Sequence, residues 1–186
     1  MKRLYVLDLD QTLVDTREAI LRCQTEGIAR ATGEQEEDLE KELKSEGLDA
    51  ALEKRGIDKD YFFETLYKPF DAFEAVKRGT VYTFADVFSA LPQLEGTKAV
   101  VSNSSQEATE KKLKALGLDQ HVDYVFAEYE RAKAKPSPCM AEKLAKTLCD
   151  LPETIINIGD REEDMQFGEE LKKLFPALRE IRIINM

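Results

Sequence analysis

Several features are absent from this sequence of 186 residues. No apolar run approaches the length of a membrane-spanning helix, and the apolar residues after Lys2 and Arg3 are soon interrupted by Asp8 and Asp10, which is not a secretory pattern. The three cysteines lack metal-like spacing, so we expect reduced thiols in a cytoplasmic protein. With 42% hydrophobic and 34% charged residues, the composition is that of a soluble globular chain.

Positive charge is also scarce. The chain has 27 Lys and Arg against 37 Asp and Glu, a formal net charge of −10. Nucleic-acid-binding proteins hold phosphate backbones with clustered basic residues, so this balance disfavours a nucleic-acid partner. The single histidine, His121, is far in sequence from the motifs described below, and we expect it to lie in a helix-to-strand connection.

Five short apolar runs are spread along the chain, and continuous runs of this kind are typical of central parallel strands. They are residues 4–7, 99–101, 122–126, 155–158 and 181–184. Helical patterns separate most of them, which predicts an α/β fold with a Rossmann-like, doubly wound parallel sheet.

Three of the helical patterns lie in the second half of the chain. One covers residues 106–116, with Ser104 and Glu107 spaced as a capping box and Gly117 as the stop. Another follows Pro138, and a third covers residues 163–174.

Between the first two apolar runs the pattern becomes entirely helical. We therefore predict a helical cap over residues 15–81, inserted into a catalytic core made of residues 1–14 and 82–186. Its aromatic residues are expected to form the insertion's own core: Tyr61, Phe62, Phe63, Tyr67, Phe70 and Phe73.

Two acids end the first apolar run. In Asp8-Leu9-Asp10 the carboxylates can point to the same side of the strand's end, with the residue between them directed away. Unpaired buried charge is costly, so an ordinary buried strand would not end in this way. Taken alone, the pair is equally compatible with a solvated acidic turn.

Polar residues follow two other runs. The second run leads into Ser102-Asn103-Ser104, where Ser104 is expected to cap the next helix and Ser102 is left to explain. The fourth run leads to Asp160, with Asp164 about one turn into a helix, so both can face one cation. An acidic helix N-terminus, favoured by the helix dipole, would give the same pattern.

A further segment, Lys135-Pro136-Ser137-Pro138, reads in isolation as a helix start with ordinary surface lysines. In this order, however, the four segments together resemble the haloacid dehalogenase-like superfamily. The motifs that carry the resemblance are Asp8-Leu9-Asp10-Gln11-Thr12, Ser102, Lys135-Pro136-Ser137-Pro138, and Gly159-Asp160 with Asp164. The predicted insertion matches that superfamily's helical cap. The chain departs from the pattern at Gln11, where members often have Gly, and at Arg161, where they often have Ser.

The resemblance implies a phosphatase that acts on a small phosphorylated metabolite. Asp8 would attack phosphorus and form an aspartyl-phosphate, while Asp10 would protonate the leaving alcohol and then activate water. The implied cofactor is Mg²⁺, held by Asp8, Asp160, Asp164 and the backbone carbonyl of Asp10. Such an ion would supply the positive charge that this acidic chain lacks.

The resemblance also implies how the phosphate is held. Ser102 and backbone amides near Thr12 and Asn103 would bind the phosphoryl oxygens, and Lys135 would balance charge in the transition state. Thr12 is expected to support the turn more than to react.

Other functions remain open at this point. A sugar-phosphate mutase would use the same intermediate, a phosphonate hydrolase would need a Schiff-base lysine, and a binding protein could have the same fold without activity. A dehalogenase would not need Asp10. The substrate's second anionic group has four cationic candidates in the predicted insertion: Arg17, Arg55, Lys68 and Arg78.

Overall fold

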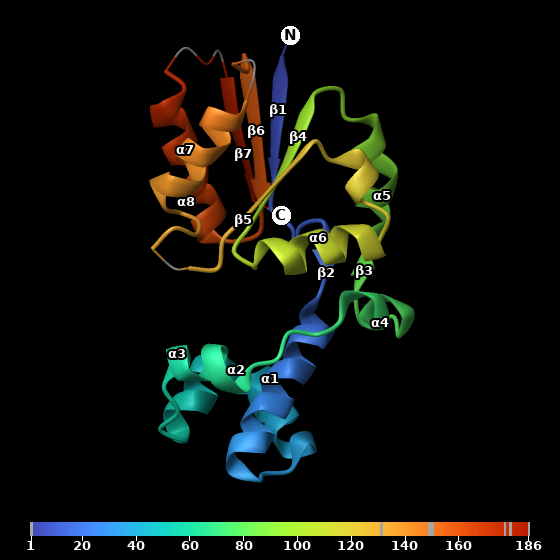
Figure 1. Cartoon of the computed structure of the whole chain (residues 1–186), viewed down its shortest axis with the longest axis vertical. Coiled ribbons are helices and arrows are strands. Elements are labelled where there is room, and N and C mark those ends of the chain that lie inside the picture. Colours follow the sequence, from blue (N-terminus) through green and yellow to red (C-terminus); the bar gives the residue numbers. More distant parts are fainter. Residues whose placement is uncertain (1, 131, 149–150, 177, 179, 186) are drawn as a thin grey trace. The chain divides into compact units, whose positions relative to one another are not determined.

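The protein is described from a computed structural model over residues 2–130, 132–148, 151–176, 178 and 180–185. It divides into two compact units. Unit 1 comprises Met1–Asp15 and Tyr82–Met186, and unit 2 is Thr16–Val81 (Figure 1). None of the helices in the described ranges combines the length and apolar character that crossing a membrane requires.

Unit 1 is built on a five-stranded sheet with the order β5-β4-β1-β6-β7 among the described residues. All four strand pairings are parallel. The strands are β1 Arg3–Leu7, β4 Thr97–Ser102, β5 Tyr124–Ala127, β6 Thr154–Gly159 and β7 Glu180–Asn185. Each predicted apolar run contributes one strand, and the strand order reverses at β1, so the predicted doubly wound α/β fold is confirmed.

Helices lie in the connections between these strands, as right-handed crossovers require. They are α5 Ala85–Ala90, α6 Gln106–Ala115, α7 Pro138–Thr147 and α8 Glu162–Leu174, with the 3₁₀ turns η2 Leu91–Gln93 and η3 Asp119–His121. The crossover from β4 to β5 runs in the opposite direction to that from β6 to β7. Therefore α6 covers one face of the sheet, and α7 and α8 cover the other (Figure 1).

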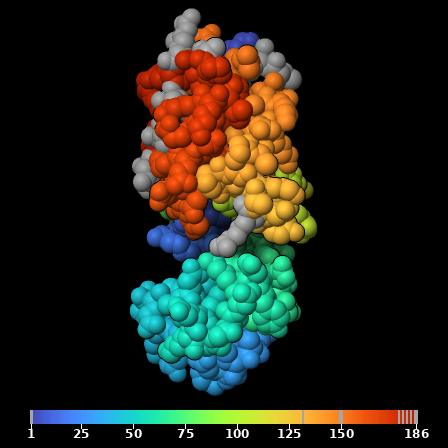
Figure 2. Space-filling view, turned by 90° about the vertical axis from the view of Figure 1, so that its left-hand side faces the viewer, coloured from blue at the N-terminus to red at the C-terminus, as the bar shows by residue number. Residues whose placement is uncertain are grey.

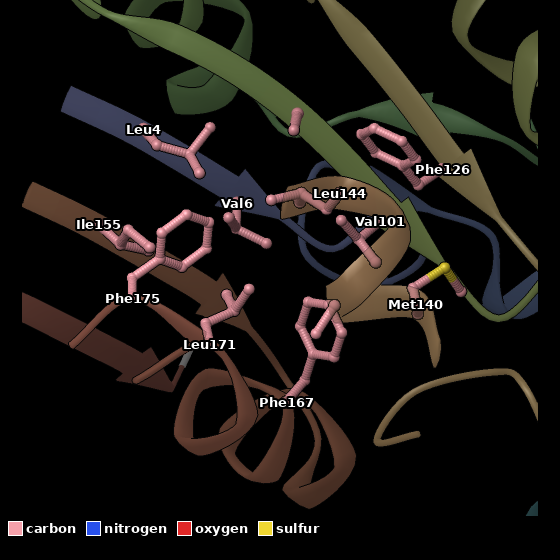
Figure 3. Close-up of a cluster of buried hydrophobic side chains, with 12 residues drawn as sticks. Leu4, Val6, Val101, Phe126, Met140, Leu144, Ile155, Phe167, Leu171 and Phe175 are labelled. Carbon is pink, nitrogen blue, oxygen red and sulfur yellow. The ribbon is translucent and has the colours of Figure 1, made fainter. Parts of the chain in front are cut away.

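The face under α7 and α8 carries a large hydrophobic cluster (Figure 3). Alternate strand residues point into it, as the two-residue period of a strand requires. Its buried members are Leu4, Val6, Ala99, Val101, Phe126, Met140, Ala141, Leu144, Ile155, Phe167, Leu171 and Phe175. Full burial of one such large side chain stabilises a fold by about 2 kcal/mol, so this cluster fixes both helices on the sheet. In the space-filling view the chain's C-terminal third forms this side of the unit (Figure 2).

The start of α6 differs from the prediction by one residue. Ser105, not Ser104, is the N-cap, and its hydroxyl accepts a hydrogen bond of 3.2 Å from the Ala108 amide. The predicted capping box of Ser104 and Glu107 is therefore wrong. The helix ends as predicted at Gly117, whose φ of 67° is a left-handed conformation that glycine adopts without steric cost.

Unit 2 is helical throughout. It contains α1 Arg17–Thr32, α2 Glu36–Lys54, α3 Lys59–Tyr61, the π-helical turn η1 Phe62–Leu66, and α4 Ala72–Lys77. Its buried cluster consists of Ile28, Leu39, Leu43, Ala51, Leu52 and Phe62. A Cβ added at Gly27 would lie 3.0 Å from the Phe62 ring, so a glycine in α1 lets this ring pack close to the helix.

The chain passes into and out of unit 2 through two short strands that belong to unit 1. These strands, β2 Val14–Asp15 and β3 Tyr82–Thr83, pair antiparallel. The Tyr82 hydroxyl donates a 3.0 Å hydrogen bond to Asp15 Oδ2, which adds a side-chain link to the backbone pairing.

The aromatic residues of unit 2 only partly form its core. Phe62 is fully buried and Tyr67 packs against the cluster, as predicted. The prediction is wrong for Tyr61, Phe63 and Phe73, which are about half exposed. The cluster is small, and Phe62 with the aliphatic side chains of α1 and α2 already fills it.

Arg55 is paired with two acids of unit 2 and is therefore a poor candidate for binding a substrate. Its guanidinium donates to both Glu42 oxygens, at 2.7 and 3.0 Å, and to both Glu34 oxygens, each at 2.7 Å. Its side chain is nearly buried. The hydrogen bonds from Arg55, and a further one from Lys54, lower the pKa of Glu42 to about 2.

Replacing Arg55 with Met should remove a specific part of the protein's acid sensitivity. Because the folded state lowers the pKa of Glu42 from 4.5 to about 2, its stabilising contribution is present above pH 4.5 and disappears as the pH falls towards 2. Thermal unfolding of both proteins, measured across this range, should show a shallower pH dependence for Arg55→Met. Lys41→Met, which breaks an exposed pair with Glu37, is the control. Identical pH dependences in wild type and Arg55→Met would contradict the assignment.

Candidate active site

The ends of three neighbouring strands bring the predicted site residues to one edge of the sheet. β1 lies between β4 and β6, so the segments that follow these strands are adjacent. Asp8 follows β1, Ser102 is the last residue of β4, and Asp160 follows β6. Ligand sites of open parallel sheets form at this carboxyl edge.

A tight turn fixes the backbone after β1. The Leu9 carbonyl accepts hydrogen bonds from the Leu13 amide at 2.9 Å and the Val14 amide at 3.0 Å. The Gln11 amide donates to the Val14 carbonyl at 2.7 Å. Gln11 has a φ of 72°, the left-handed region in which L residues other than Gly are uncommon. This is the position where the resemblance predicts Gly, and the turn geometry gives the physical reason.

Lys135 links two acids at the centre of the site. Its Nζ donates to Asp8 Oδ1 at 2.7 Å and to Asp164 Oδ1 at 2.5 Å, and its side chain is 4% exposed. The Asn103 side chain holds the Lys135 backbone in both directions. Asn103 Oδ1 accepts from the Lys135 amide at 2.8 Å, and Asn103 Nδ2 donates to the Lys135 carbonyl at 3.1 Å. The side chain of Asn103 therefore fixes the backbone of Lys135.

Asp8 lies in an environment that opposes its negative charge. Burial is the largest cause, and it raises the pKa of Asp8 to about 6 even though Lys135 acts in the opposite direction. The nearby Asp164 and Asp10 add to the rise. Burial also raises the pKa of Asp160.

Three carboxylates fit a divalent cation. Asp8, Asp160 and Asp164 each offer an oxygen, and these oxygens lie within 4.8 Å of one another. Asp8 Oδ2 and Asp160 Oδ1 are buried and have no hydrogen-bond partner within the described part of the chain. Unpaired buried carboxylate oxygens are costly, and hard oxygen ligands of this kind suit Mg²⁺. The donor set is therefore that of a candidate magnesium site.

The segment after β6 orients the third of these acids. Asp164 lies in the first turn of α8, and its Oδ2 accepts from the Arg161 amide at 3.1 Å. Asn157 Nδ2 donates to the Asp164 carbonyl at 2.8 Å, which ties the helix to the strand. A Cβ at Gly159 would overlap the Asp164 side chain. Only glycine lets the strand end approach this acid so closely.

The two predicted hydroxyl residues are both buried. Ser102 Oγ accepts a 3.2 Å hydrogen bond from the Ser104 amide, which leaves its own proton available to donate. Thr12 is fully buried, and its Oγ1 has no partner among the residues described. The placement of Thr12 inside the turn favours a supporting role over contact with a ligand.

Asp10 has an unexpected partner in Lys112. The Lys112 Nζ, on α6, lies 2.6 Å from Asp10 Oδ1 and 2.5 Å from Oδ2, and Ser104 Oγ donates to Oδ2 at 3.2 Å. Sequence reasoning missed this lysine because it lies among exposed lysines. The available signal was its spacing from Thr109 and Leu116, which places it on the inward face of the helix.

Known proteins match this chain both in sequence and in structure. The sequence model of the haloacid dehalogenase-like hydrolases matches residues 5–173. The chain is 30% identical to a phosphoglycolate phosphatase of Aquifex aeolicus (strain VF5), over 90% of this chain and 80% of that protein.

Solved structures share the fold. A predicted phosphoglycolate phosphatase from Haemophilus somnus 129PT matches 99% of this chain and 84% of its own, with a TM-score of 0.66 and 18% identity. A hydrolase of subfamily IA of the haloacid dehalogenase superfamily, from Geobacter sulfurreducens PCA, matches 98% and 86%, with a TM-score of 0.67 and 18% identity. At this identity the structures establish the fold alone.

These comparisons define the class of protein as a hydrolase of the haloacid dehalogenase type, with a parallel α/β sheet and a helical cap inserted after the first strand. The chain belongs to the haloacid dehalogenase-like hydrolase family.

Replacing Gln11 with Val should destabilise unit 1. A β-branched side chain is strongly disfavoured at positive φ, so we expect a loss of about 1–2 kcal/mol in the free energy of unfolding. Gln11→Gly relieves the same strain and should be no less stable than the wild type. Urea unfolding of the three proteins measures both effects. A Val variant as stable as the wild type would show that the turn is not left-handed in solution.

Replacing Gly159 with Ala should weaken divalent-cation binding. The new methyl group would displace the Asp164 side chain, and disturbing the shell around metal ligands costs about tenfold to a hundredfold in affinity. Calorimetric titration with Mg²⁺ measures the change, and the unfolding temperature of the metal-free variant shows whether the fold persists. An unchanged affinity in a folded variant would separate Asp164 from the metal site.

Proposed function

We propose that this protein is a magnesium-dependent phosphatase that hydrolyses a small organic phosphate monoester through an aspartyl-phosphate on Asp8. The observation that carries the proposal is the state of the Asp8 carboxylate. One oxygen is bound by Lys135, whereas the other is buried without a hydrogen-bond partner among the described residues. A carboxylate held at one oxygen and free at the other is suited to nucleophilic attack.

In the first step Asp8 attacks phosphorus, and the bond between phosphorus and the leaving oxygen breaks. Lys135 holds the nucleophile in place and offers positive charge beside the oxygens that become more negative in the transition state. The Asn103 side chain fixes the backbone of that lysine, so the charge is positioned before substrate arrives. Ser102, whose oxygen accepts from the Ser104 amide, would donate its proton to a phosphoryl oxygen.

Asp10 acts in both steps, as the general acid in the first and as the general base in the second. It donates the proton to the oxygen of the departing alcohol and becomes a carboxylate. It then takes a proton from the water that attacks the aspartyl-phosphate, which regenerates Asp8 and releases inorganic phosphate. General acid–base catalysis of this kind contributes about 10²- to 10⁴-fold to the rate.

Asp8, Asp160 and Asp164 would hold the magnesium ion, together with the backbone carbonyl of Asp10. When bound, the ion supplies positive charge that lets an anionic carboxylate and an anionic phosphate approach each other. A buried oxygen of Asp160 that has no hydrogen-bond partner among the described residues supports this assignment.

The substrate proposal starts from the similarity to the Aquifex aeolicus protein, which is named a phosphoglycolate phosphatase. We propose 2-phosphoglycolate as the first ester to test. Specificity for the leaving group would come from the helical unit, where Lys68 and Arg78 are exposed cations. Arg55 is excluded from this role by its bonds to Glu34 and Glu42.

Phosphate release from a panel of esters tests the proposal. The panel contains 2-phosphoglycolate, glucose 6-phosphate, a nucleoside monophosphate and 4-nitrophenyl phosphate, each with Mg²⁺. The wild type should release phosphate, and Asp8→Asn should reduce the rate by at least about a thousandfold, because removal of a nucleophile has effects of this size. A chelator should abolish release, and added Mg²⁺ should restore it.

Asp119→Asn is the matched control, since this acid is exposed on η3 and outside the site. It should behave as the wild type. Turnover that persists in Asp8→Asn would contradict the nucleophile assignment, and turnover that persists in chelator would contradict the metal. If the folded wild type releases no phosphate but moves it between sugar hydroxyls, the protein is a mutase with the same intermediate.

A further inference from the structure

Lys112 is a buried lysine that the proposed chemistry does not yet use. It lies in the last turn of α6, and its side chain is only 6% exposed. The other buried residues of this helix are Thr109 and Leu113, as expected for a helix packed on a sheet. A lysine on such a face is an exception, because burying an ammonium group is costly unless it is paired.

In the described part of the chain, Asp10 is the only carboxylate that Lys112 contacts. Its Nζ lies 2.6 and 2.5 Å from the two oxygens of Asp10, so it holds both sides of the carboxylate. Ser104 Oγ donates to Asp10 Oδ2 at 3.2 Å and lies 3.5 Å from the Lys112 Nζ. The three side chains form one polar cluster.

A purely structural role does not explain this lysine. A cation near the C-terminus of a helix stabilises it through the helix dipole, but Lys114, in the same turn, gives that benefit while remaining exposed. An apolar residue at position 112 would avoid the cost of burying charge. What only a cation provides here is a bond to the carboxylate of Asp10.

The turn after β1 fixes the backbone of Asp10 but not its side-chain torsions. Two residues of the neighbouring segment fix the side chain. Ser104 follows β4, and Lys112 lies on the helix that begins just after it. Since β1 and β4 are paired in the sheet, the position of the carboxylate is tied to the sheet itself.

Charge leads to the same conclusion. The site contains four carboxylates, those of Asp8, Asp10, Asp160 and Asp164, and Lys135 contacts only two of them. Asp10 becomes a carboxylate once it has given its proton to the departing alcohol, and without Lys112 this new negative charge would repel the anionic aspartyl-phosphate. The paired ammonium reduces this repulsion in a site where water screens charge poorly.

We propose that Lys112, assisted by Ser104, is a positioning residue that holds the Asp10 carboxyl group in the orientation needed for proton transfer to and from the reacting oxygens. The proposal rests on the proposed function, because it assigns Lys112 to the same two-step reaction. Lys112 itself exchanges no proton and forms no bond with substrate.

The proposal makes the effect of Lys112 depend on the leaving group. An alkoxide needs a proton from Asp10 as it departs, whereas 4-nitrophenolate leaves without one. The value of kcat/KM covers the steps up to formation of the aspartyl-phosphate. Losing the orientation of Asp10 should therefore lower kcat/KM for an alkyl ester much more than for the nitrophenyl ester.

The experiment compares Lys112→Met with the wild type on 2-phosphoglycolate and 4-nitrophenyl phosphate, using glucose 6-phosphate as the alkyl ester if the wild type prefers it. Misplacing a catalytic group by about 1 Å costs about a hundredfold, so we expect the alkyl ester to lose about tenfold to a hundredfold in kcat/KM. The nitrophenyl ester should lose no more than about threefold, since its first step needs no proton from Asp10. Lys112→Arg, which restores the cation, should recover part of the loss.

Lys111→Met is the matched control. This neighbouring lysine is exposed and pairs with Glu107 on the helix surface, so the variant should match the wild type on both esters. If Lys112→Met does not fold, as judged by circular dichroism, Ser104→Ala replaces it as the test. Removing that hydroxyl should give a smaller loss with the same dependence on the leaving group.

The outcomes are distinct. A wild type that releases phosphate, together with a loss confined to the alkyl ester, supports the proposal. Equal losses on both esters, or no loss in the variant that folds, would overturn it and leave the phosphatase proposal standing. A wild type that hydrolyses neither the alkyl nor the nitrophenyl ester would overturn both.

Discussion

The site depends on the two ion pairs that the buried ammonium of Lys135 makes. It joins Asp8, at the end of β1, to Asp164, in the first turn of α8. Two carboxylates from different elements would repel each other at this separation, and the lysine turns that repulsion into a link between strand and helix. Burying an ion pair costs desolvation energy, which is offset only if the geometry is good. The neighbouring residues must therefore fix the position of Lys135. The reciprocal hydrogen bonds from Asn103 provide that restraint.

The sheet makes this arrangement possible. In parallel strands the carboxyl ends meet at one edge, so residues distant in sequence become neighbours without a long loop to hold them. Each acid also has a local device that fixes it. Asp10 directly precedes Gln11, whose backbone is left-handed, and Asp164 is accommodated because position 159 has no side chain. The strained backbone at Gln11 and the glycine at position 159 therefore each lie where an acid of the site needs a close approach.

Much of this could be predicted from the sequence, because strands buried on both faces are apolar runs and acids at their ends are unusual. The parts that could not be predicted depend on side-chain direction. Ser104 and Ser105 are adjacent and equally good caps, and only the structure shows that Ser105 caps α6 while Ser104 contacts Asp10. Lys112 is one of three lysines within the four positions 111–114. Arg55 could be identified as a cation but not as one already paired with Glu34 and Glu42.

The antiparallel pair β2–β3 has a consequence for how this chain can change over evolution. Asp15 and Tyr82, the residues that flank unit 2, face each other in one ladder and share a side-chain hydrogen bond. Since the two junctions are already side by side, the sheet does not require any particular length or fold between them. The helical unit is in this sense a replaceable module. Selection can exchange or remodel the helical unit while the acids, lysines and strand order at the carboxyl edge of the sheet are inherited unchanged.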